Sequence, residues 1–422
     1  MFRWASGAVP GYRALLILQA LSAFNHNQLR SALLTLVAFR EMDRYGMSAE
    51  TVVALSTLLI VSPFATLSIF GGRMADKWPK ASVIQAIKAT EIPVFLIAGV
   101  ALISMNVPLL LLSILLAGVE AALLGPAKFG VLPELLPADD LVAANASMSA
   151  TNTMAILLGL IAGNLLILLD GGLYIVAIGG VTIGVAGWVA SLSLPHTRAL
   201  MPSLKLHPAH LVLDFWSCFR RLGAVPVVIL PVVGCSWFWF QGAVNTTLFP
   251  LYVAASPDSA ENVVSLLLIA SGMGVAVGAL GARLLAVRNT SAWLPVAVFA
   301  VVFLPGVDLW FAGPMQTSQG VMRAMFDLFL LAIGTGFYVV PLHAALQRLT
   351  PHDERARFIG VNHTFNGIAM IAAGFAVLLF GAVEMEIPAM FLLTTGTTGM
   401  IAAWTLSATL RALYRNNAVA TA

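Results

Sequence analysis

A run of polar residues interrupts the first long apolar stretch of this chain. Positions 24–30 read Phe-Asn-His-Asn-Gln-Leu-Arg, in the middle of the apolar stretch 12–38. An arginine at the centre of a membrane span costs about 2.5–3.5 kcal/mol of insertion free energy, so these side chains must face a cavity or partner helices. Because a guanidinium can bind a phosphate or a carboxylate, we expect Arg30 to contact a substrate. Asn25 and Asn27 could contact the substrate too, or could join helices by hydrogen bonds.

A second candidate is Glu120, a carboxylate inside the apolar sequence LLAGVEAALLG. It could pair with Arg30 or with a protonated His26. Such a pair has a functional role if an anionic ligand opens it, and serves stability alone if it is permanent. Lys88 and Glu91 are three residues apart, so we expect them to form a structural pair on one helix face.

In the second half of the chain, the candidate residues inside the apolar stretches are polar rather than charged. Gln241 and Asn245 follow the aromatic run 237–240, and Asn362 lies in a later apolar stretch. We expect these three side chains to line the pathway. His343 follows Pro341, and it could contact a substrate or, as we favour, be a hydrogen-bonded histidine near a helix end.

A short charged turn, GGRMADKWPK, occupies residues 71–80 between two apolar runs. Gly72 lets two helix ends approach closely. Asp76 and Lys80 can join a charge cluster that closes one side of a transporter and opens again during the cycle. The turn resembles the loop between the second and third spans of the major facilitator superfamily. The alternative is an ordinary cytoplasmic loop that is rich in cations.

The composition indicates a membrane protein with many spans. Hydrophobic residues make up 59% of the chain and charged residues 10%, whereas a soluble domain has about 25% charged residues. The formal net charge of +3 is explained by cytoplasmic lysine and arginine, so we expect no nucleic-acid partner. We expect the first span to be retained rather than cleaved as a signal peptide.

At roughly 20 residues per span, the sequence predicts an all-α membrane protein with twelve transmembrane helices. We place them at 12–38, 50–71, 82–104, 107–128, 141–168, 171–194, 224–254, 262–285, 292–312, 319–347, 357–382 and 388–412. The polar segment 195–223 divides them into two six-helix halves, 1–194 and 224–422, and is expected to be a cytoplasmic loop. Lysine and arginine concentrate in alternate loops, which places both termini in the cytoplasm.

The sequence offers little for enzyme chemistry. It contains no GxxxxGK[ST] phosphate loop, no GxSxG and no His-x4-Asp acyltransferase motif. Its histidines and cysteines lack metal-ligand spacing. We therefore expect a transporter without a catalytic residue, a cofactor or a metal site, rather than a membrane-embedded acyltransferase.

The stretch GPAKFGVLPELLPADDLVAANASMSATNTMAILLGLIAG at 125–163 closely resembles bacterial lysophospholipid transporters of the major facilitator superfamily. The resemblance extends to FNHNQLRSALLTLVAF, SWFWFQGA and FYVVPLHAALQ, and so spans nearly the whole chain. It implies the major facilitator fold, with Asn27, Arg30 and Lys128 at matching motif positions. Two positions depart from the pattern, because the family typically has aspartate where this chain has His26 and a small or neutral polar residue where it has Glu120.

The resemblance implies inward flipping of lysophospholipids, or of similar amphipathic substrates, across the bacterial inner membrane by alternating access. Reacylation would follow on the cytoplasmic side, by an acyltransferase and acyl-carrier-protein synthetase of the kind fused to some relatives. We expect a monomer among membrane lipids. The alternative is a proton-coupled exporter of a drug, siderophore or other amphipathic metabolite, using His26 and Glu120.

Overall fold

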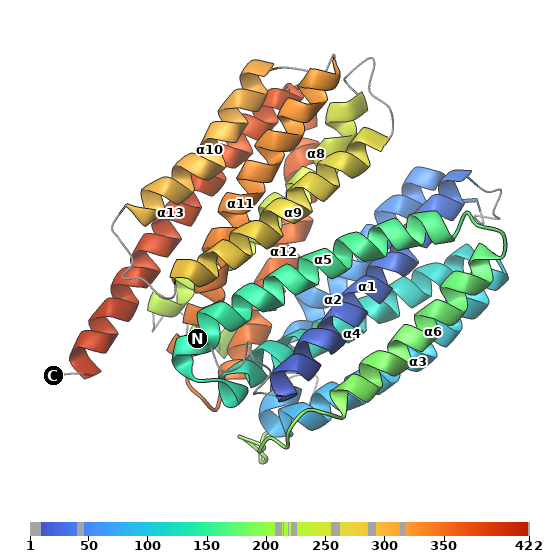
Figure 1. Cartoon of the computed structure of the whole chain (residues 1–422). Coiled ribbons are helices and arrows are strands. Elements are labelled where there is room, and N and C mark those ends of the chain that lie inside the picture. Colours follow the sequence, from blue (N-terminus) through green and yellow to red (C-terminus); the bar gives the residue numbers. More distant parts are fainter. Residues whose placement is uncertain are drawn as a thin grey trace. The chain divides into compact units, whose positions relative to one another are not determined.

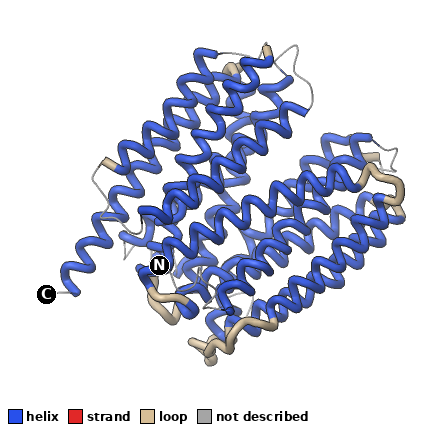
Figure 2. The backbone as a smooth tube through the Cα atoms, in the orientation of Figure 1, coloured by secondary structure: helices blue, strands red, loops and turns tan. Residues whose placement is uncertain are grey.

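The computed structural model describes residues 10–39, 46–206, 213, 215–217, 219–220, 226–254, 262–285, 293–312 and 317–420. Within these ranges the chain is helical and contains no strand (Figure 2). The helices labelled in Figure 1, with the short 3-10 helix η1, are α1 (Pro10–Phe39), α2 (Ala49–Lys77), α3 (Lys80–Ile103), α4 (Val107–Leu135), η1 (Ala138–Asp140), α5 (Leu141–Leu166), α6 (Gly172–Ser191), α8 (Pro226–Ala254), α9 (Asn262–Leu285), α10 (Leu294–Ala312), α11 (Ser318–Leu349), α12 (Arg355–Ala382) and α13 (Ile387–Ala420).

These helices confirm the all-helical fold that the apolar runs predict. Eleven helices of the described part of the chain are long and apolar enough to cross a membrane. The long helix outside this set is α1, because its polar run lowers its mean hydropathy. The structure places helices at all twelve predicted spans.

The chain forms two compact units. Unit 1 contains residues 1–137, 154–218 and 351–364, and unit 2 contains residues 138–153, 219–350 and 365–422. Helices α5 and α12 each contribute residues to both units, so the units do not test the predicted division into six-helix halves. In the predicted loop 195–223, residues 195–206 are not helical, residues 213, 215–217 and 219–220 are helical, and the others lie outside the described residues.

In unit 1, an apolar core holds the helices that carry the candidate residues. Side chains of α1, α2, α3, α4 and α6 contribute to this core, including Leu33, Phe95 and Ile114. Two glycines of α5 lie directly on α1. A Cβ atom at Gly159 or Gly163 would collide with the carbonyl oxygen of Phe24 or Gln28. Small residues spaced by four allow helices to approach this closely in membranes, and the contact fixes α1 at its polar run.

Unit 2 uses the same packing at a second pair of helices. Gly274 and Gly278 of α9 lie on the backbone carbonyls of Phe329 and Ile333 of α11. Helix α10 packs beside α13 (Figure 1). The ends of two helices correspond as well, because α4 stops before Leu136-Pro137 and α11 stops before Thr350-Pro351. A proline disfavours helical geometry at the residue before it, which explains why both helices end there.

Candidate functional site

Four ionisable side chains of unit 1 form a buried cluster, and three helices supply them. His26 comes from α1, Lys88 and Glu91 come from α3, and Glu120 comes from α4. All four side chains are less than a tenth exposed. Since each helix buries an apolar face in the same core, the cluster lies in a low-dielectric setting where unpaired charge is costly.

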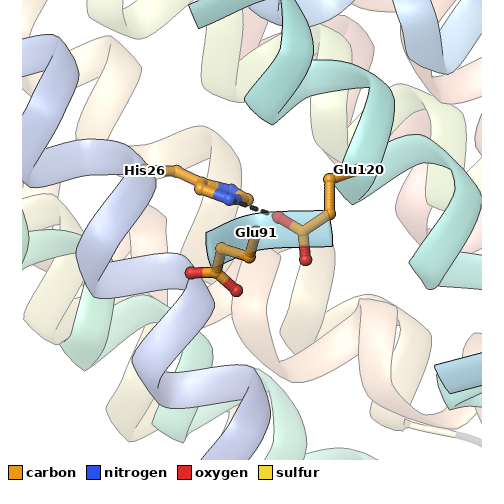
Figure 3. A group of neighbouring side chains, drawn as sticks. All are labelled: His26, Glu91 and Glu120. Atoms are coloured by element: carbon orange, nitrogen blue, oxygen red, sulfur yellow. Dashed lines mark ion pairs between the residues drawn. The ribbon is translucent and has the colours of Figure 1, made fainter. Parts of the chain in front are cut away.

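His26 pairs with Glu120. The imidazole Nε2 lies 2.6 Å from the carboxylate Oε2, and Figure 3 shows the ring directed at this carboxylate. The imidazole also stacks on Phe95, with 6.1 Å between ring centroids. Of the two partners that the sequence allows for Glu120, the structure therefore selects His26. The alternative pairing of Glu120 with Arg30 is wrong, because Arg30 bonds to a different helix.

Lys88 and Glu91 form the ion pair that their spacing predicts. The pair is tied into its surroundings more extensively than the spacing suggests. Lys88 Nζ donates to Ser22 Oγ at 2.5 Å, and Ser22 Oγ donates to Glu91 at 3.2 Å. Asn25 Nδ2 donates to Glu91 at 3.0 Å and to the carbonyl of Gly180 at 2.9 Å. Asn25 thus joins α1, α3 and α6, which supports the structural alternative for this residue.

Histidine and carboxylate atoms of the cluster approach one another at a spacing that can hold a metal ion. Ligand-type atoms of His26, Glu91 and Glu120 all lie within 4.8 Å of one another (Figure 3). The sequence gives no sign of this group, because its members come from three helices. However, the Lys88 ammonium bonds Glu91 and lies 3.9 Å from Glu120. The Lys88 ammonium therefore already supplies, beside these carboxylates, the positive charge that a metal ion would bring.

Arg30 lies one helical turn beyond His26 and outside the cluster. Its Nη2 donates to Thr57 Oγ1 of α2 at 2.8 Å, while its buried Nε has no hydrogen-bond partner. Among the described residues, no carboxylate oxygen lies within 4.0 Å of its guanidinium. Arg30 is therefore a cation that the described part of the chain leaves without a counter-charge.

The other predicted residues of unit 1 have local contacts. Asn27 Nδ2 donates to the carbonyl of Ala23, one turn back on the same helix, at 2.7 Å. Lys128 is half-buried, and its Nζ lies 5.4 Å from the centre of the Phe129 ring. Asn362 belongs to unit 1 although it comes from the second half of the sequence. It is buried, and neither of its amide atoms has a hydrogen-bond partner.

In unit 2, Gln241 and Asn245 belong to a chain of hydrogen bonds. Gln241 Nε2 donates to Asn245 Oδ1 at 2.7 Å, and Gln241 Oε1 accepts from Thr398 Oγ1 at 2.7 Å. Trp237 Nε1 then donates to Thr398 at 2.9 Å. Sequence reasoning missed Thr398, which lies 157 residues from Gln241. His343 is half-buried on α11.

The segment predicted as a turn, 71–80, is largely helical, because residues 71–77 complete α2 and Lys80 begins α3. The last turn of α2 contacts the start of α12 within unit 1. Both oxygens of Asp76 accept hydrogen bonds from the backbone N–H groups of Ala356 and Arg357, each at 3.2 Å, and Arg357 Nε donates at 3.0 Å. A carboxylate at a helix N-terminus is favoured by the unpaired N–H groups and by the helix dipole. Gly72 makes this contact possible, because a Cβ there would lie 2.5 Å from the Ala356 carbonyl.

Lys80, the third predicted member of this turn, pairs with Glu134 at the end of α4, at 2.6 Å. Sequence reasoning missed Glu134 and Arg357, because each lies far along the chain from its partner. The segment after α6 also contacts Asp76 and Arg357. The Met201 N–H donates to the Asp76 carbonyl at 2.8 Å, and Arg357 Nη2 lies 3.0 Å from Met201 Sδ.

The sequence matches the family model of the major facilitator superfamily over residues 15–374. It is similar to proteins named lysophospholipid transporter LplT. The one from Pectobacterium carotovorum is 31% identical over 337 residues, covering 79% of this chain and 77% of the relative. The one from Yersinia pestis is 30% identical over 363 residues, covering 85% and 84%.

Solved structures show the same fold at low sequence identity. The human organic anion transporter MFSD10 has a TM-score of 0.71 and 13% identity, covering 94% of this chain and 99% of that one. The major facilitator transporter FucP has a TM-score of 0.68 and 13% identity, covering 94% and 97%. At this identity the likeness concerns the fold alone.

Substitutions in the Lys88–Glu91 pair test whether the charges of the buried cluster balance one another. In Lys88→Met, two buried carboxylates share one histidine, so we expect a loss of about 3–5 kcal/mol in stability. In the double variant Lys88→Met with Glu91→Met, the remaining His26–Glu120 pair stays balanced, and most of this loss should be recovered. Thermal unfolding of the detergent-purified protein measures both.

The matched control is Lys77→Met, because Lys77 is half-buried and lies 5.5 Å from the centre of the Trp78 ring. It should unfold close to the wild-type temperature. A single variant as stable as the wild type, or a double variant no better than the single, would contradict the described charge balance.

Proposed function

We propose that this chain, which belongs to the major facilitator superfamily and within it to the family of LplT lysophospholipid transporters, moves lysophospholipids across the bacterial inner membrane by alternating access. It is a multi-pass membrane protein of a transporter family, which favours transport over enzyme chemistry. The alternation of cationic and acidic loops supports a topology with both termini in the cytoplasm.

The observation that carries this proposal is the unbalanced Arg30. In a low-dielectric span, a cation without a counter-charge is stabilised by any anion that reaches it. The phosphodiester of a lysophospholipid is such an anion, and a guanidinium binds phosphate oxygens with charge-assisted hydrogen bonds. The unpartnered Nε of Arg30 leaves a donor for this purpose.

The surroundings of Arg30 suit an amphipathic substrate. The polar residues of α1 adjoin the apolar core of unit 1, so a head group and an acyl chain would meet different surfaces of one helix bundle. Asn27, which matches a family position, would join Arg30 at the head group. Lys128, which also matches one, lies eight residues after Glu120 on α4 and would meet the head group at another point of the pathway. Gln241, Asn245, His343 and Asn362 would contribute polar contacts along the pathway.

The physiological role that we propose is the return of lysophospholipids to the cytoplasmic side for reacylation. The sequence resemblance to the transporter domain that is fused to acyltransferase and acyl-carrier-protein synthetase supports this role and that partner. A proton-coupled exporter of another amphipathic metabolite is the second candidate, and the buried His26–Glu120 pair favours it.

Asp76 would act as a gate in either case. Its carboxylate holds the start of α12 by three hydrogen bonds, and such a contact must form and break if helices move during transport. Gly72 permits the close approach, and Lys80 anchors the same turn to α4 through Glu134.

Arg30→Ala tests the head-group site. We expect uptake of radiolabelled lysophosphatidylethanolamine by spheroplasts to fall about tenfold to hundredfold, because a charged hydrogen bond contributes about 1.5–3 kcal/mol. Membrane expression should stay near normal, and Arg30→Lys should keep part of the activity. Arg411→Ala, at an exposed position on α13, is the control and should transport normally. A poorly expressed Arg30→Ala protein with full activity per molecule would show that Arg30 is structural.

Asp76→Asn tests the gate. The amide keeps the size of the side chain but removes the charge that binds the α12 N-terminus, so the state with this contact loses stability. We expect the uptake rate to fall about tenfold, the equivalent of about 1.4 kcal/mol, while the equilibrium affinity for lysophosphatidylethanolamine changes little. Asp139→Asn, at a fully exposed carboxylate, is the matched control. Normal uptake by Asp76→Asn would remove the residue from the gate.

A further inference from the structure

Three charged side chains of unit 2 gather where α10 ends and α11 begins. Asp308 lies near the end of α10, and Arg323 and Asp327 lie one turn apart near the start of α11. The two helices pack side by side (Figure 1). Arg323 donates from Nε and Nη2 to the two oxygens of Asp308, at 2.6 and 2.5 Å. In the proposed topology, this end of unit 2 faces the extracytoplasmic side.

The carboxylate of Asp327 lacks the partner that its burial requires. Asp327 is 5% exposed, and Ala324 and Leu328 beside it on α11 belong to the apolar core of unit 2. Its Oδ2 atom is buried without a hydrogen-bond partner, and no described cation lies within 4.0 Å of the carboxylate. The side chain instead interacts with that of Asp308. A buried carboxylate that meets a second carboxylate needs a donor from elsewhere.

The charges at this end of unit 2 do not balance. Asp308 and Asp327 carry two negative charges when both are ionised, and Arg323 compensates one of them. The segment between α12 and α13 adds only Glu384 and Glu386, which are both exposed. The described residues at this end therefore leave an excess of negative charge, and its buried part lies on Asp327.

The missing partner has the chemistry of a primary ammonium group. One positive charge balances the buried excess, and three N–H donors can meet Asp327 and Asp308 together. Calcium suits the cluster less well, because it takes about six to eight oxygen ligands. Two carboxylates and the nearby hydroxyl of Tyr252 on α8 offer fewer. The guanidinium of Arg323 also repels a divalent ion more strongly than a monovalent one.

We infer that Asp327 and Asp308 bind a primary ammonium group, and that the ethanolamine head group of a lysophospholipid supplies it. The identity of this lipid rests on the proposed function, to which the inference adds a residue that distinguishes head groups. A phosphate contact at Arg30 is common to all lysophospholipids, whereas an ammonium contact separates ethanolamine from glycerol head groups. The side chains of Arg323 and Asp308 are 49% and 42% exposed, so a ligand can reach the pair from solution.

Asp327→Asn tests this contact, because it keeps the size of the side chain and removes its charge. We expect uptake of lysophosphatidylethanolamine by spheroplasts to fall about tenfold, within the range that a hydrogen bond to a charged group supplies. Uptake of lysophosphatidylglycerol, which has the phosphate and no ammonium, should stay close to the wild-type rate. Glu386→Gln removes an exposed negative charge at the same end, and this control should take up both lipids like the wild type. Equal losses for the two lipids, or no loss for either, would overturn the inference while the proposed function stands.

Calorimetry of the purified full chain with water-soluble head groups gives a readout independent of transport. Wild type and Glu386→Gln should bind glycerophosphoethanolamine more tightly than glycerophosphoglycerol, and Asp327→Asn should lose this preference. If the wild type takes up neither lipid, the proposed function fails, and this measurement decides the ammonium site alone. No preference in the wild type, or a preference that Asp327→Asn retains, would overturn the site. A preference that equimolar sodium chloride abolishes would assign the site to an inorganic cation and overturn it as well.

Discussion

The cost of burying charge in a low-dielectric interior is the constraint on which the candidate site depends. Unit 1 contains several ionisable side chains in its helices, and four ion pairs join eight of them. Asp76 binds Arg357, Lys80 binds Glu134, Lys88 binds Glu91, and His26 binds Glu120. Arg30 departs from this pattern, with a hydroxyl as its hydrogen-bond partner and no carboxylate near it. We propose a functional role for Arg30 on this ground, because a half-buried cation without a counter-charge is stabilised by an anion that comes from elsewhere.

Helix packing decides where these charges can meet. Gly159 and Gly163 bring α5 onto the backbone of α1 at the polar run, and Asn25 ties the same run to α3 and α6. The His26–Glu120 contact is thereby positioned by backbone contacts and by amide hydrogen bonds rather than by its own strength. At the other end of α2, Gly72 allows the backbone approach that puts Asp76 at the start of α12. In both places, close packing at a glycine brings the charged side chain within reach of its partner.

Features that depend on local spacing could be predicted from the sequence. Apolar runs located the helices, and the three-residue separation of Lys88 and Glu91 predicted their pair. The sequence allows two side chains of α1 as partners of Glu120, because periodicity does not show which face of that helix meets α4. Arg357 and Thr398 were missed for a related reason, since their bonds to Asp76 and Gln241 span 281 and 157 residues. A single sequence contains no signal for such pairings, which depend on how separate helices pack.

The central claim is that a lysophospholipid head group binds beside Arg30 on α1. Photo-crosslinking measures this most directly, using a lysophosphatidylethanolamine analogue with a photoreactive group on its head group and peptide mapping by mass spectrometry. The account predicts labelling of α1 around residues 24–30 and of the facing part of α2 near Thr57, with unlabelled lipid competing for both. Labelling confined to the apolar outer faces of the helices, or unaffected by competing lipid, would contradict it.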